Sequence, residues 1–172
     1  MKLYSGQIPT IAQELAQTLA SSDVLDVEDE NMHEFQRDIE AILEEYLRLD
    51  RELTEQAKDE AASSGGSFSQ VQRIKRRLAK RVNFSYGEDA LDWITQQLIE
   101  IFFQSVFVEE VYGEDHDLRR VMTPVLRRHF EVDQELDREV RAKIRNIQEG
   151  SRNWDIEYEQ AMQRIRRNRG LE

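Results

Sequence analysis

The sequence predicts an all-α protein made of two tandem, pseudo-equivalent helical units of about four helices each, packed about an approximate twofold axis. The first observation is a repeat: residues 11–61 align without a gap with residues 94–144, at a constant offset of 83, with 10 identities in 51 positions. The second is that apolar residues coincide in the two copies, as at Leu15 and Leu98. The third is that these residues recur every three or four positions, which is the spacing of an amphipathic helix.

The first unit is expected to cover residues 1–62. Its first helix should begin near Pro9, because the fixed φ angle and missing N–H of proline suit a first helical turn. Apolar residues then follow on one face of this helix. They are Ile8, Ile11, Leu15 and Leu19.

The second helix forms a heptad-like seam, through which we expect the two units to pack. The seam residues are Phe35, Ile39, Ile42, Tyr46, Leu49 and Leu53 in the first copy, and Leu118, Met122, Val125, His129, Val132 and Leu136 in the second. Asp50 and Asp133 are interpreted as N-caps where the seam bends into a third helix. Pro124 replaces Ala41 and is predicted to kink or restart its helix, because proline removes a backbone donor and clashes with the preceding turn.

Two short apolar stretches, residues 24–27 and 107–111, follow the first helix of each copy. Each suits either a short extended piece or an apolar-lined loop. Periodicity over so few residues does not distinguish the two.

Residues 63–67 are rich in serine and glycine and predict a flexible link. Residues 68–83 then predict a basic amphipathic helix that completes the first unit. The second unit is expected over residues 84–172. There, Gly150 is predicted to stop a helix and Ser151 or Asn153 to cap the last one, whose buried face would carry Trp154, Tyr158, Ala161 and Ile165.

Composition excludes several kinds of site. The chain has no cysteine, so neither a disulfide framework nor a thiolate metal site is possible. It shows no apolar run long enough for a signal peptide or a membrane span, so we expect a cytoplasmic protein that does not enter a membrane. The net charge of −11 discourages non-specific binding to nucleic acid, although residues 61–85 carry six Lys/Arg and no Asp/Glu.

Three segments resemble a known bacterial family, the domain-of-unknown-function family 507. They are the opening Met1-Lys2-Leu3-Tyr4, the run from Glu131 to Val140, and the run Glu149-Gly150-Ser151-Arg152-Asn153-Trp154 with the residues up to Tyr158. The chain looks like the two-copy form of that family. The resemblance implies the repeated architecture but no activity.

His33 and His116 occupy equivalent positions, and each is followed by an acid and, four residues on, by an arginine. A composite metal or acid/base site between the copies is one interpretation, since histidine with carboxylates suits zinc or iron. The favoured interpretation is that both are surface residues in a first helical turn, because one histidine per copy is a weak ligand set.

The sharpest charge feature is a basic arc on the helix predicted for residues 68–83. At 100° per residue the arc spans about 140° and contains Arg73, Arg76, Arg77, Lys80 and Arg81. It would either grip the phosphates of a nucleic acid or another acidic partner, or be neutralised by the acidic first unit of the same chain. Intramolecular neutralisation is favoured, because that partner is present at high effective concentration.

No phosphate-binding glycine loop, nucleophile elbow or metalloprotease motif occurs in the sequence. We therefore expect a non-enzymatic structural or protein-interaction protein that needs no cofactor and binds a protein partner or itself. Trp93, Phe103 and Tyr112 are candidate contact residues, because the helical seams do not use them. The alternative is a nucleic-acid-associated protein that binds phosphates through residues 73–81.

Overall fold

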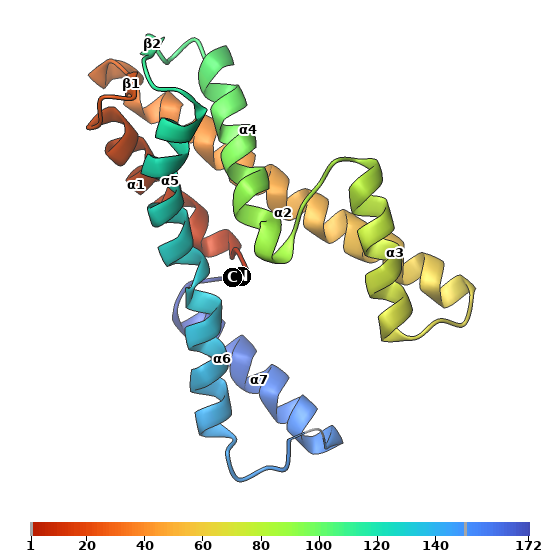
Figure 1. Cartoon of the computed structure of the whole chain (residues 1–172). Coiled ribbons are helices and arrows are strands. Elements are labelled where there is room, and N and C mark those ends of the chain that lie inside the picture. The colour runs from red at the N-terminus through yellow and green to blue at the C-terminus, as the bar shows by residue number, and fades with distance from the viewer. Residues whose placement is uncertain (1, 150) are drawn as a thin grey trace.

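The computed structural model describes residues 2–149 and 151–172 and shows a helical head from which two arms diverge (Figure 1). The elements are α1 (Ile8–Ala20), β1 (Leu25–Asp26), α2 (Met32–Ser63), α3 (Phe68–Arg81), α4 (Ala90–Gln104), β2 (Glu110–Val111), α5 (Asp115–Phe130), α6 (Val132–Lys143) and α7 (Arg152–Asn168). The predicted all-α class is confirmed, since β1 and β2 are the only strands in the described residues.

The head is built from α1, α4, α5 and the first half of α2. Here α1 packs against both α2 and α5, and α4 packs against the same two helices. Among the described residues, the seams of α2 and α5 therefore find their main partners in α1 and α4 rather than in each other. Phe35 and Phe102 lie at the centre, fully buried, with ring centroids 5.3 Å apart.

The two short apolar stretches left open by the sequence each contribute a two-residue strand. β1 pairs with β2 in antiparallel register, Leu25 opposite Val111 and Asp26 opposite Glu110. The ladder closes the end of the head that is remote from the arms (Figure 1).

The first arm consists of the second half of α2 and of α3, which packs back on it. The predicted third helix beginning at Asp50 is wrong, because α2 continues through this residue to Ser63. No glycine or proline interrupts α2, so nothing in its local sequence ends the helix at Asp50. Ala57 and Ala61 of α2 are buried with Ile74 of α3, whereas Leu53 joins the core of the head.

The second arm consists of α6 and α7, and here a break does occur. It lies at Glu131 and not at Pro124, since α5 continues past Pro124 to Phe130. Pro124 and Arg120, whose carbonyl would have accepted the missing bond, are both exposed, so water can satisfy that carbonyl. The cap assignment of Asp133 is also wrong, because Glu131 is the residue that flanks α6.

Ser151 caps α7 as predicted, and its side chain accepts a hydrogen bond from the Trp154 N–H at 3.1 Å. The predicted helix stop at Gly150 lies outside the described residues. The two ends of the chain meet where the arms leave the head, which we call the fork (Figure 1). The backbones approach so closely there that a Cβ on Gly6 would lie 1.9 Å from the Gly170 carbonyl oxygen.

Candidate interaction surfaces

Two of the basic residues of α3 form ion pairs within the first arm. Lys75 is only 8% exposed, and its ammonium lies 2.7 Å from the Asp50 carboxylate and 4.3 Å from the centre of the Tyr86 ring. Arg77 donates to the Glu60 carboxylate at 2.5 Å, across the pair of helices. Intramolecular pairing therefore accounts for part of the predicted basic arc.

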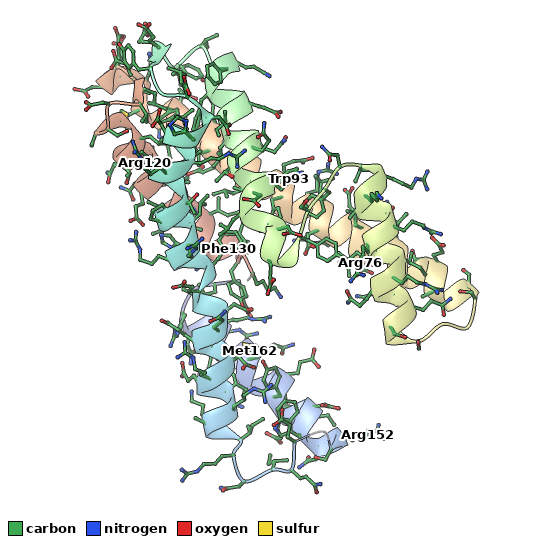
Figure 2. The ribbon with its side chains drawn as sticks, viewed as in Figure 1. Arg76, Trp93, Arg120, Phe130, Arg152 and Met162 are labelled. Carbon is green, nitrogen blue, oxygen red and sulfur yellow. The ribbon has the colours of Figure 1, made fainter. Side chains whose placement is uncertain are left out.

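The rest of the arc faces solvent. We call Arg73, Arg76, Lys80 and Arg81 the basic stripe; all four are exposed, and none forms an ion pair with the residues that the structure describes. The arm that carries them projects away from the acidic head (Figure 2, where Arg76 is labelled). Within the described residues, direct ion pairing thus accounts for Arg77 of the predicted arc but not for these four.

A second surface lies at the far end of the head, around the β-ladder. We call Phe103, Val106 and Tyr112 the apolar tip, since their side chains are 63%, 83% and 59% exposed. Acidic residues lie on and beside the adjoining β-ladder: Asp26 on β1, Glu28 after it, Glu109 before β2 and Glu110 on it. These charges affect one another: the carboxylate of Glu109 is the main cause that raises the pKa of Glu28.

Trp93 differs from the other two predicted contact residues. Its ring packs against Tyr46 and Phe84, with centroids 5.8 Å and 5.1 Å away. Its indole N–H donates to the Asn83 carbonyl oxygen at 3.0 Å. The Trp93 side chain therefore already has packing and hydrogen-bond partners within the chain, next to the place where the first arm leaves the head (Figure 2).

The two candidate metal-binding histidines both lie on the surface. His116 has its ring nitrogens 3.5 Å from Glu114 and 3.3 Å from Asp117, and its side chain is 71% exposed. His33 is exposed in the first turn of α2. Within residues 2–149 and 151–172, no group of three or more His, Asp or Glu side chains is arranged to hold a metal ion.

The fork contains two similar clusters that sequence reasoning missed. In one, the Tyr4 hydroxyl donates to the Asp133 carboxylate at 2.5 Å, and the Arg166 guanidinium lies 5.0 Å from the centre of the Tyr4 ring. Burial and the hydrogen bond to Asp133 raise the pKa of Tyr4. This cluster ties the segment before α1 to both helices of the second arm.

The other cluster is the set of Asp50, Lys75 and Tyr86 on the first arm. Asp50 and Asp133 are equivalent in the repeat, and Tyr86 precedes α4 as Tyr4 precedes α1. Each cluster thus contains one aspartate and one cation from the second helix of the same arm, which is α3 or α7. Its tyrosine comes from the segment that precedes the first helix of the other half. The equivalence of the aspartates was the available signal, but their partners are distant in sequence.

Lys2 lies between the two clusters. Burial lowers the pKa of its ammonium, and the charge of Arg166 lowers it further, while Asp133 and Asp50 oppose the shift. The charges of both arms therefore act on one residue at the start of the chain.

Comparison with known proteins bears on the family but not on the activity. The family model of a protein of unknown function (DUF507) matches residues 1–171, which is nearly the whole chain. No curated protein matches the chain. In the described residues, no helix combines the length and the apolar character needed to cross a membrane. The chain belongs to the DUF507 family.

Proposed function

We propose that this member of the DUF507 family is a non-enzymatic cytoplasmic interaction protein whose head docks a basic, partly apolar segment of a partner protein. The observation that carries the proposal is the apolar tip, three large side chains exposed within ten residues of sequence. Adjacent exposed apolar side chains commonly mark interaction sites. Aromatic residues such as Phe103 and Tyr112 are frequent anchors of protein interfaces.

The charge around the tip selects the kind of partner. Asp26 and Glu110 lie beside Tyr112, and the carboxylates of Glu110 and Asp26 contribute, after desolvation, to raising the pKa of Tyr112. Opposite charge steers association and suppresses wrong partners. A partner segment with Lys or Arg flanking an apolar anchor is therefore complementary to this surface, whereas an acidic segment is repelled.

We further propose that the two halves are related by an approximate twofold axis, as expected for a duplicated unit. The antiparallel pairing of β1 with β2 supports this, because two equivalent segments pair in this way about a twofold axis. The two fork clusters support it too, since each joins one half's arm to the other half's opening segment. Such reciprocal exchange is typical of an isologous contact. The absence of cysteine suits the cytoplasm.

The test is site-specific photo-crosslinking in cells that make the protein. A photoreactive residue at Val106 should capture a discrete protein, and the crosslinked peptide should be basic and apolar. The same residue at Val82, which is 56% exposed on the first arm, is the matched control. F103S combined with Y112S should abolish the crosslink at 106. Equal capture at both positions, or an acidic crosslinked peptide, would refute the proposal.

A further inference from the structure

We infer that the basic stripe of α3 is a nucleic-acid-binding surface that contacts the sugar-phosphate backbone. The inference is independent of the apolar tip, which lies on the head at the opposite end of α2. Three observations carry it: the local charge, the spacing of the cations, and the absence of an apolar anchor among them.

The first arm has the opposite charge to the head. Residues 48–83 contain nine Lys/Arg against five Asp/Glu, a net charge of +4. The remaining head residues, 1–47 and 84–131, contain six against 21, a net charge of −15. A polyanion approaching this molecule is therefore repelled by the head and attracted by the arm, which orients the encounter.

The spacing of the stripe suits a phosphate chain. Arg73 and Arg81 are eight residues apart, so their Cα atoms are separated by about 12 Å along the helix axis. B-form duplex carries one negative charge per about 1.7 Å of axis, or 3.4 Å per strand, so several phosphates lie within reach of four long side chains. Arginine, which supplies three of the four cations, binds phosphate oxygens bidentately.

The stripe lacks what a protein partner needs. The apolar side of α3 is used in packing within the chain, since Ile74 packs with Ala57 and Ala61 of α2 and Ala79 joins the core of the head. Among the described side chains from α3 to its C-cap, the exposed large apolar residue is Val82, which follows the stripe and does not lie within it. Stable protein interfaces have a desolvated apolar centre, whereas backbone binding to nucleic acid is carried by cations alone. These features favour a nucleic acid over an acidic protein.

The experiment measures binding of the full chain to a labelled 20-base-pair DNA duplex and a 20-nucleotide RNA by fluorescence anisotropy between low and physiological salt. We expect binding at low salt with a log–log slope of about −3 to −4, at about 0.9 per phosphate contacted. The variant R73Q/R76Q/K80Q/R81Q should lose affinity by at least about tenfold and show a slope near zero.

The matched control removes the same charge elsewhere. Arg37, Arg138, Arg145 and Arg152 are exposed on the head and the second arm, and their combined replacement by glutamine should leave binding unchanged within about twofold. Labelled polyglutamate is the probe for an acidic protein. No binding to either nucleic acid at low salt, equal losses in the two variants, or tighter binding of polyglutamate would each overturn the inference.

Discussion

Tyr158 and Asp137 show how a single polar contact joins the two helices of the second arm. The Tyr158 hydroxyl donates to the Asp137 carboxylate at 2.6 Å. This hydrogen bond is the main cause that lowers the pKa of Asp137, and Arg141 adds to it. For the donor of this hydrogen bond, burial and the same contact raise the pKa of Tyr158 to about 12. The contact therefore favours the ionised carboxylate and the neutral phenol.

Replacing Tyr158 by Phe should lower the free energy of unfolding at pH 7 by about 1 kcal/mol. The loss is small because the Asp137 side chain is 39% exposed and solvent screens it. A carboxyl whose folded pKa is depressed contributes stability above its unfolded pKa of about 3.9 and loses it as the pH falls through the folded value. The difference between wild type and variant should therefore narrow below about pH 4.

Denaturant unfolding at pH 7, 5 and 3 measures this difference. Tyr112, exposed at the apolar tip, supplies the control, since Y112F should change stability by no more than about 0.5 kcal/mol. A difference for Y158F that stays constant from pH 7 to pH 3 would contradict the assignment.

Asp50 and Asp133 show what sequence reasoning can reach at the residue scale. Their equivalence follows from the repeat, and both form contacts between separate parts of the chain. The specific role as helix caps was wrong, because Asp50 pairs with Lys75 and Asp133 accepts from Tyr4, 129 residues away. Partners supplied by another helix or the other half leave no spacing pattern in the sequence.

At the scale of elements, helical periodicity predicted the helices but not where they break. The continuous α2 and the pair α5 and α6 occupy equivalent positions, yet only the second is interrupted. Proline was the obvious candidate, but α5 accommodates Pro124 on its exposed face. The two-residue strands were undecidable from sequence, because they exist only by pairing with each other.

Pro124 and Ala41 allow a reciprocal test, since they are equivalent positions on the exposed faces of α5 and α2. Proline inside a helix costs about 3 kcal/mol relative to alanine. A41P should therefore destabilise the protein by about that amount. P124A should stabilise it by a smaller amount, on the order of 1 to 2 kcal/mol, because the proline also restricts the unfolded chain.

Chemical denaturation followed by circular dichroism measures both variants. Glu44, exposed one turn beyond Ala41, gives a control, since E44A should change stability by no more than about 0.5 kcal/mol. A destabilising effect of P124A would contradict the view that the proline is an unfavourable residue which α5 accommodates on its exposed face.

At the scale of the whole molecule, the two fork clusters add polar contacts to those that hold the arms. The head has a large apolar core, which Leu53 of α2 and Ala79 of α3 join, and a separate small set between α2 and α3 consists of Ala57, Ala61 and Ile74. The second arm has its own small core, to which Tyr4 and Leu171 from the chain ends contribute. The core of the second arm is separate from the head core, so the contact between Asp133 and Tyr4 supplies a constraint there that apolar packing does not, and in the first arm the contact between Asp50 and Lys75 adds to the apolar packing.

We expect the double variant D50A/D133A to keep a folded head but to lose the fixed separation of its arms. The chain has no cysteine, so spin labels on Q72C and Q160C report only the distance between exposed positions on α3 and α7. Pulsed electron–electron double resonance should give one narrow distribution of label-to-label distances for the wild-type background and a broader one for D50A/D133A. The matched pair E52A/E135A removes the same charge from exposed neighbours and should retain the narrow distribution. A narrow distribution in D50A/D133A, with helical content unchanged, would show that the apolar contacts hold the arms by themselves.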